Sequence, residues 1–239
     1  MPSNHKILFI IPARGGSKGL KGKNIKVCAD KPLIEWTIDA ALESKYCEHI
    51  VISTDSQEIA KFSESKGITM YGLRSSELSS DTASMLSVVQ YELARFRSRY
   101  ANLQISAAVI LQPTSPLRTS RHIDEAIDYY FTNRKTAEDT LISVKTVDSK
   151  YSWIMQENKS GYLSFVSNKI NSLNPTRQDL IDLYLPNGAI FILPILTLDR
   201  WVYGENTMFY VMSEVASIDI DNEEDFRAAE SRLRDANSM

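Results

Sequence analysis

The sequence predicts an α/β protein with a doubly wound, mostly parallel sheet. Its 239 residues include continuous apolar runs rich in Ile and Val, of which Lys6–Pro12 (KILFIIP) is the first. Such runs are typical of strands that are covered on both faces. Between them lie segments whose apolar residues recur at helical spacing. Strands that alternate with helices imply parallel pairing, with the helices packed on the sheet.

The first 145 residues carry most of this alternation. Each expected strand is an apolar run that ends at polar residues, and each expected helix has apolar residues three and four apart. In chain order the elements are a strand at Lys6–Pro12, a helix over Leu33–Leu42, a strand at His49–Ser53, a helix at Gln57–Ser65, a strand at Ile68–Tyr71, a helix from Asp81 or Thr82 to Phe96, a strand at Ala107–Leu111, a helix from Thr119 or Ser120 to Phe131 and a strand at Thr140–Val144.

The pattern changes after Val147. Ser152–Gln156 and Tyr162–Val166 are expected as two short strands of a hairpin, because turn residues separate them. Strand character returns at Gly188–Leu193, Phe209–Met212 and Ile218–Asp221, and a final helix follows Asn222 as its cap. Residues 146–186 are therefore expected as an insertion in a domain formed by residues 1–145 and 187–239.

Charge and composition exclude several classes of protein. The formal net charge is −3, whereas a general nucleic-acid binder is normally basic. No run approaches the roughly 18 apolar residues of a membrane span. The first residues lead directly into a strand without a signal-peptide pattern, so we expect a cytoplasmic protein. Cys28 and Cys47 form no zinc spacing, and the three histidines are scattered, which disfavours zinc and haem.

The loop after the first strand is a candidate anion site. Residues 12–24 (PARGGSKGLKGKN) hold four of the nine glycines and four basic residues. Glycines let backbone N–H groups approach an anion, and Arg and Lys neutralise phosphate charge. The loop matches neither the Walker A pattern nor GxGxxG, which excludes a dinucleotide-dependent oxidoreductase. The alternative is a solvated loop whose charges serve solubility.

Three further segments carry polar groups at expected loop or strand ends. Asp219 and Asp221 would share one face of a strand and suit Mg²⁺, although the segment could simply cap the last helix. Gln112 lies in a loop stiffened by two prolines, which could equally be a helix-entry turn. Arg74 precedes a polar cluster at residues 79–84, for which ordinary helix capping is the alternative.

Together these segments form a series of motifs. They are IIPARGGSKGLKGKN from Ile10, STD from Ser53, RSSELSSDTAS from Arg74, LQPTSPLR from Leu111, LPNGAIFI from Leu185 and SIDID from Ser217. In order and spacing they resemble the acylneuraminate cytidylyltransferases (CMP-sialic acid synthetases), including CMP-legionaminic acid synthetases. The CMP-Kdo synthetases fit less well, because their first loop differs and they lack LQPTSPLR. The resemblance covers nearly the whole chain and implies a Rossmann-like nucleotidyltransferase fold.

The resemblance implies that CTP and a nine-carbon 2-keto sugar acid react to give a CMP-sugar and pyrophosphate. Arg14 and Lys23 would hold the triphosphate, and Ser17 would cradle it with backbone amides of the loop at Gly15 and Gly16. The implied roles of the other residues are cytosine recognition by Asn24 and Arg74 with Ala13 and Ser84 lining the pocket, sugar contact by Gln112, a sugar or phosphate contact by Arg177, and Mg²⁺ binding by Asp219 and Asp221.

The resemblance also gives the insertion a role. Residues 146–186 would form a dimerisation arm that reaches the sugar site of a partner, so a homodimer is expected. The chain departs from the family pattern in two places: Asp148–Trp153 reads DSKYSW without the Pro and Lys of the sialic acid enzymes, and Met85 replaces a frequent second serine. The first departure lies in the sugar-facing arm and bears on the acceptor. N-acetylneuraminic and legionaminic acids are therefore both expected acceptors, with pseudaminic acid and Kdn as alternatives.

Two other functions remain open at this point. One is a nucleotidyltransferase for Kdo or a sugar 1-phosphate, which differs in the acceptor group. The other is a regulator that binds CTP without turnover, which would release no pyrophosphate.

Overall fold

The computed structural model describes residues 5–16, 19–167, 181–195, 198 and 201–237. Its central sheet has six strands in the order β10-β6-β9-β5-β1-β4. β1 is parallel to β4 and β5, and β10 is parallel to β6, whereas β9 is antiparallel to both β5 and β6. The strand bounds are β1 Ile7–Pro12, β4 His49–Ser53, β5 Ala107–Ile110, β6 Thr140–Val147, β9 Leu183–Pro194 and β10 Thr207–Val211.

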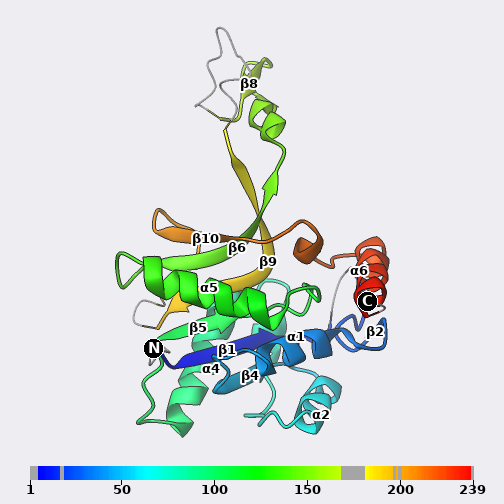
Figure 1. The fold of residues 1–239 in the computed structure, drawn as a ribbon, viewed down its shortest axis with the longest axis vertical. Helices are drawn as coiled ribbons and strands as arrows, with labels where there is room; N and C mark the ends of the chain where they lie inside the picture. Colours follow the sequence, from blue (N-terminus) through cyan, green and yellow to red (C-terminus); the bar gives the residue numbers. More distant parts are fainter. Residues whose placement is uncertain (1–4, 17–18, 168–180, 196–197, 199–200, 238–239) are drawn as a thin grey trace.

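Helices cover both faces of this sheet (Figure 1). The longer helices are α1 (Leu33–Leu42), α2 (Gln57–Ser65), α4 (Met85–Arg99), α5 (Ser120–Asn133) and α6 (Glu223–Asn237), and α3 (Ser76–Ser79) is a single turn. Strand alternation divides the core, because Phe9 and Ile11 pack with residues of α1 and α5, whereas Leu8 and Ile10 pack with residues of α4. The doubly wound, mostly parallel α/β class predicted from the sequence is confirmed.

Two expected strands are absent from the described part of the chain. Ile68–Tyr71 has no ladder partner; Ile68 is buried in one core cluster, and Met70 and Tyr71 pack against the outside of the two main clusters. Ile218–Asp221 is extended but unpaired as a ladder, since only the Ile220 N–H bonds to a neighbouring carbonyl, that of Thr114. A short apolar run can bury its side chains without its backbone joining a sheet. Both predictions of a strand were wrong for this reason.

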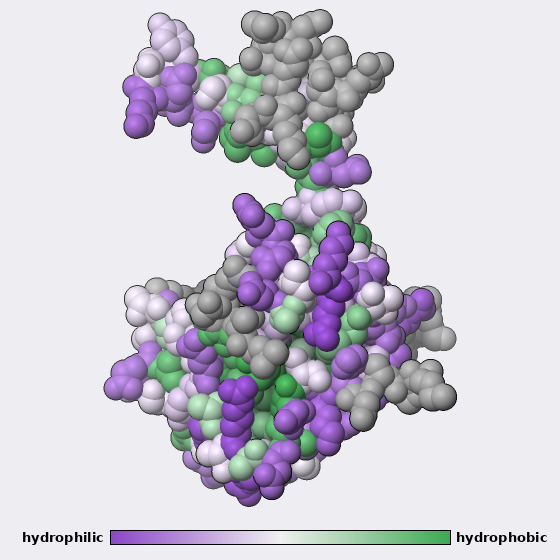
Figure 2. Space-filling view, turned by 90° about the vertical axis from the view of Figure 1, so that its left-hand side faces the viewer, coloured by the Kyte–Doolittle hydropathy of each residue, from purple (hydrophilic) through white to green (hydrophobic). Residues whose placement is uncertain are grey.

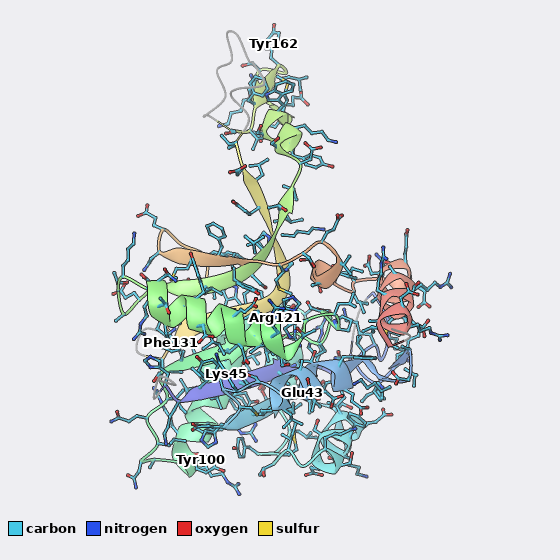
Figure 3. All side chains as sticks on the ribbon, viewed as in Figure 1. Glu43, Lys45, Tyr100, Arg121, Phe131 and Tyr162 are labelled. Carbon is cyan, nitrogen blue, oxygen red and sulfur yellow. The ribbon has the colours of Figure 1, made fainter. Side chains whose placement is uncertain are left out.

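β6 and β9 extend beyond the sheet as a two-stranded ribbon (Figure 1). The ribbon carries a 3₁₀ turn at Ser149–Trp153 and a hairpin of β7 (Met155–Glu157) and β8 (Leu163–Phe165), so the expected hairpin is confirmed with shorter strands. In Figure 2 the described part of this projection is joined to the body by a narrow neck. Tyr162 lies at its far end (Figure 3).

Smaller elements complete the fold. β2 (Val27–Cys28) and β3 (Lys31–Pro32) form a short antiparallel pair before α1, and a 3₁₀ turn at Val215–Ser217 precedes the Asp219 segment. Within the described ranges, no helix combines the length and the apolarity that crossing a membrane requires.

Candidate active site

A polar cavity of about 450 Å³ lies where the first loop, the loop after β5 and the segment before α6 meet. The loops at the carboxyl ends of β1 and β5 form much of it, as expected for ligand sites in open α/β sheets. Seven predicted site residues line it, namely Arg14, Lys23, Asn24, Arg74, Gln112, Asp219 and Asp221. The structure thus brings together residues that are up to 207 positions apart in the chain, from Arg14 to Asp221.

Hydrogen bonds from and to its backbone hold the first loop in place. The N–H of Ala13 donates to the Ser53 carbonyl at 2.9 Å, and the N–H of Gly15 donates to Asp55 Oδ1 at 2.8 Å. Asn24 is buried, and its Nδ2 donates to the carbonyl of Arg14 at 2.9 Å. These contacts tie the loop to the end of β4 and fix the backbone on which Arg14 projects.

Lys23 lies beside the two acidic residues. Its Nζ donates to the carbonyl of Ile220, at 2.5 Å, between Asp219 and Asp221 in the chain. Burial lowers the pKa of Lys23, whereas the carboxylates of Asp221 and Asp219 raise it. The cation therefore sits in the cavity with anionic neighbours, in place to contact a phosphate.

Asp219 and Asp221 both line the cavity although their segment is not a strand. The intervening Ile220 is fully buried against α6, so the extended backbone keeps the two carboxylates on the side opposite to Ile220. Burial raises the pKa of Asp219, the nearby Thr114 hydroxyl lowers it, and the negative charge of Asp221 raises it again. The sequence predicted the two carboxylates on one face of a strand, and here they share one side of an extended segment that joins no sheet.

These carboxylates fit a magnesium ion. Oδ1 of Asp219 is buried without a hydrogen-bond partner among the described residues, which leaves an acceptor for a cation. Mg²⁺ prefers one or two carboxylates completed by water and substrate phosphates. No group of three or more His, Cys, Asp or Glu suited to a metal occurs in the described ranges, so a site formed by protein side chains alone finds no support there.

Gly188 lies close to the side chains of both Gln112 and Asp219. Its φ is +73°, and a β-carbon there would lie 3.0 Å from Asp219 Oδ2 and 3.2 Å from Gln112 Oε1. A glycine is therefore needed at this position for both the backbone conformation and the close approach. The amide of Gln112 and the carboxylate of Asp219 both approach Gly188 and both line the cavity.

Arg74 is a buried cation in the lining of the cavity. Its side chain is buried, and Nε donates to Ser79 Oγ at 3.1 Å. Its backbone N–H donates to the Thr54 carbonyl at 2.7 Å. Burial lowers the pKa of Arg74, while the carboxylates of Asp55 and Glu92 raise it. Its amino groups can serve a neutral hydrogen-bonding ligand such as a nucleobase.

Arg14 forms an ion pair with Asp81. Its Nη1 lies 2.7 Å from Asp81 Oδ1, and both residues line the cavity. Asp81 was not among the predicted site residues although it lies in the polar cluster before α4, because the sequence does not show that a side chain 67 residues away reaches the first loop. Thr114 and Gly19 also line the cavity. Both lie in motifs that carry the family resemblance, but neither was predicted to contact a ligand.

Other predicted residues lie next to the cavity or outside the described chain. Ala13 is fully buried within the first loop, and Ser84 caps α4 by accepting from the N–H of Ser87 at 3.0 Å. Gly15 lines a neighbouring hollow, and a β-carbon on Gly16 would meet nothing within 4 Å. Ser17 and Arg177 lie outside the described residues.

Gly19→Ala is expected to disrupt the site. A β-carbon on Gly19 would lie 2.0 Å from the carbonyl oxygen of Asp221, so the loop and the acidic segment must separate. Because a displacement of about 1 Å can lower a rate by about 100-fold, we expect a loss of that order in the CTP-dependent activity that the sequence resemblance implies. Gly204→Ala is the matched control, since its nearest contact would be an ordinary 3.8 Å to Asn206. Steady-state pyrophosphate release measures both, and equal rates would contradict the expected clash.

Comparison with known sequences identifies relatives. A family model described as cytidylyltransferase matches residues 8–164. The chain is 37% identical over 226 residues to an N-acylneuraminate cytidylyltransferase from Escherichia coli, covering 94% of this chain and 51% of the relative. It is 34% identical over 238 residues to a CMP-N,N'-diacetyllegionaminic acid synthase from Legionella pneumophila, covering 95% and 96%. The chain thus spans about half of the first relative and nearly all of the second.

The fold also matches solved structures. A CMP:2-keto-3-deoxy-manno-octonic acid synthetase complexed with CTP superposes with a TM-score of 0.68, covering 98% of this chain and 100% of that protein at 14% identity. At that identity the likeness is one of fold.

Proposed function

The chain belongs to the cytidylyltransferase family, and from that membership we propose that it transfers CMP from CTP to a nine-carbon 2-keto sugar acid. The observation that supports this most is the cavity in which Arg14 and Lys23 meet the carboxylates of Asp219 and Asp221. Cations for a triphosphate, carboxylates for a magnesium ion and hydrogen-bonding side chains for a base and a sugar all line this one cavity.

The proposed reaction is an in-line displacement. The oxygen of the anomeric 2-hydroxyl forms a bond to the α-phosphorus of CTP, the bond to the bridging oxygen breaks, and pyrophosphate leaves. The hydroxyl proton passes to a basic oxygen or solvent. Such a step depends on positioning and charge neutralisation more than on a covalent intermediate.

Arg14 and Lys23 would neutralise the triphosphate. Arg14 exchanges Asp81 for phosphate oxygens when CTP binds, and Lys23 contacts the α-phosphoryl group or the departing pyrophosphate. Gly15, Gly16 and Ser17 would contribute backbone and hydroxyl donors. Asn24 and Arg74 would read cytosine, with Ala13 and Ser84 at the edge of its pocket.

Asp219 and Asp221 would hold Mg²⁺. A bound Mg²⁺ supplies charge neutralisation on phosphate oxygens and a lower pKa for a bound hydroxyl. The acidic pair lies next to Gln112, so the acceptor would enter at this end with Gln112 as one of its hydrogen-bond partners. Arg177 is proposed as a further contact to the sugar acid or the phosphate.

The acceptor is proposed to be N-acetylneuraminic or legionaminic acid, because relatives named for each match nearly the whole chain. Pseudaminic acid, Kdn and Kdo are the alternatives. CTP as the nucleotide donor favours a cytoplasmic location.

Pyrophosphate release from CTP and Mg²⁺ with a panel of these five acids tests the proposal. Release with one nine-carbon acid would support it and identify the acceptor. Binding of CTP with no release on any acid would contradict it and favour a regulator without turnover. Release with Kdo alone, or with a sugar 1-phosphate added as a further acceptor, would assign another nucleotidyltransferase.

A homodimer built through residues 146–186 is proposed from the surface of the projection. Tyr151, Ile154, Val166, Tyr184 and Leu185 are 41–55% exposed and line a hollow of about 830 Å³ at its base. Apolar side chains gathered on a projecting ribbon are typical of surfaces that dock another protein. A second copy of the chain is the proposed occupant, with the arm reaching the sugar end of the partner's cavity.

Tyr162→Asp combined with Leu163→Asp is expected to weaken this dimer. These side chains are 72% and 67% exposed on the hairpin, and two charges in an apolar interface would be desolvated without partners. Sedimentation equilibrium should show a fall from twice to once the chain mass of 27.0 kDa. Leu42→Asp, at an exposed apolar position of α1, is the control that should remain dimeric. A monomeric wild type would contradict the prediction.

A further inference from the structure

Arg118 is a buried cation behind the cavity, at the end of the loop that follows β5. Its side chain is among the largest fully buried ones, with 1% of the residue exposed. Nη1 donates to the carbonyls of Gln112 and Ala189, each at 3.0 Å, and Nη2 donates to Thr37 Oγ1 at 2.6 Å. One guanidinium therefore connects the loop after β5, strand β9 and helix α1.

The contacts of Arg118 include no carboxylate among the described residues. Burial lowers its pKa to about 9, and its Nε has no hydrogen-bond partner in the described chain. An apolar side chain of similar size would fill this space without the desolvation penalty of a charge. Packing alone therefore does not explain an arginine here, whereas its rigid fork of donors does suit a task of alignment.

The groups that Arg118 holds are those that set the sugar end of the cavity. Gln112 lies two residues after the end of β5, and it lines the cavity. Ala189 follows Gly188, against which Gln112 Oε1 and Asp219 Oδ2 both rest. A change in the separation of the Gln112 and Ala189 carbonyls would thus alter the separation of Gln112 and Asp219.

We propose that Arg118 is a positioning residue that aligns the acceptor-binding Gln112 with the carboxylate of Asp219. The inference rests on the proposed function and adds a residue that makes no contact with substrate. Arg14, Asn24 and Arg74, the proposed contacts of CTP, have no hydrogen bond to this guanidinium in the described structure, so we expect binding of CTP to depend on Arg118 far less than binding of the sugar acid.

Arg118→Lys and Arg118→Met test this role. Lys keeps the charge but has a single nitrogen for three acceptors, and Met keeps the length without donors. With the acceptor found for the wild type, we expect both to lower kcat by about 100-fold and raise the KM for the sugar acid about tenfold, because misplacement near 1 Å has effects of this order. The KM for CTP, and CTP binding measured by calorimetry, should change less than about threefold.

A second pair of variants separates positioning from folding. Thr37→Val removes the oxygen that accepts from Arg118 Nη2, whereas Thr37→Ser keeps it. The Val variant should therefore show the same rise in KM for the sugar acid as the Arg118 variants, and the Ser variant should keep the wild-type KM. Thr140→Val is the control, since its buried hydroxyl donates to Val202 at 2.7 Å, away from the cavity. If the Arg118 variants do not fold, the Thr37 pair decides.

The outcomes distinguish the inference from the proposed function. Unchanged KM values with only a smaller active fraction, or equal effects on CTP and sugar acid, would overturn the positioning role while the wild type remains a cytidylyltransferase. A wild type that releases no pyrophosphate with any acceptor would overturn the proposed function, and the inference with it.

Discussion

Replacing Lys23 with alanine should lower kcat by about 100- to 1000-fold while the protein stays folded. Lys23 Nζ lies in the cavity, bonded to the Ile220 carbonyl between the two carboxylates. A preorganised cation or donor at the developing charge of a transition state is typically worth a factor of this size. The loss should appear in kcat and in kcat/KM for CTP, measured by pyrophosphate release at saturating sugar acid.

Lys26→Ala is the matched control for this experiment. Lys26 follows in the same loop, but its ammonium pairs with Glu223 at 2.8 Å on the surface. Exposed pairs of this kind contribute at most about 1 kcal/mol to stability, so the variant should retain its rate. If Lys23→Ala and Lys26→Ala turn over equally, Lys23 has no part in the reaction.

Replacing Asp219 with asparagine should abolish most metal-dependent turnover. Its buried Oδ1 is free of hydrogen bonds to described residues, so the carboxylate is available to a cation. Because metal-assisted charge stabilisation is worth several kcal/mol, we expect a fall in kcat of about 100-fold or more. The Mg²⁺ concentration for half-maximal rate should rise, in a titration at fixed CTP.

The same substitution should not reduce stability. Burial raises the pKa of Asp219, which means that the fold disfavours its ionised form, and a raised carboxyl pKa lowers stability as pH rises through and above the ordinary value. A neutral amide removes this penalty at neutral pH. Thermal unfolding of Asp219→Asn should therefore occur at or above the wild-type temperature, with the exposed Asp235→Asn as control. A destabilised variant with normal metal dependence would favour a structural role for Asp219.

Much of this site was accessible from the sequence because local chemistry specified it. Glycines and cations in residues 12–24 indicated an anion loop, and the alternation of Asp219, Ile220 and Asp221 indicated two carboxylates on one side. Both inferences depend only on neighbours in the chain. The structure supports that geometry even where the element type differs, since Ile220 is buried in an unpaired segment.

Contacts between distant segments could not be obtained in this way. The Arg14–Asp81 pair and the approach of Gly188 to Asp219 depend on where loops from different strands meet. At Ile68–Tyr71 a local pattern instead predicted a strand that does not form. Ile68 is buried in the core, and that burial produced a strand-like pattern although its backbone joins no ladder.

The position of β9 has a consequence for the order in which the chain can fold. β5 ends at Ile110 and β6 begins at Thr140, but the two strands do not pair with each other. β9 lies between them in the sheet, and it ends only at Pro194. During synthesis, the emerging sheet of β4, β1 and β5 keeps an open edge until more than seventy further residues have been made. Open edges template wrong pairing, and late, non-local pairing slows folding. A ribosome-bound chain ending before β9 should therefore depend on chaperones, and the sheet should close only once β9 pairs with β5 and β6.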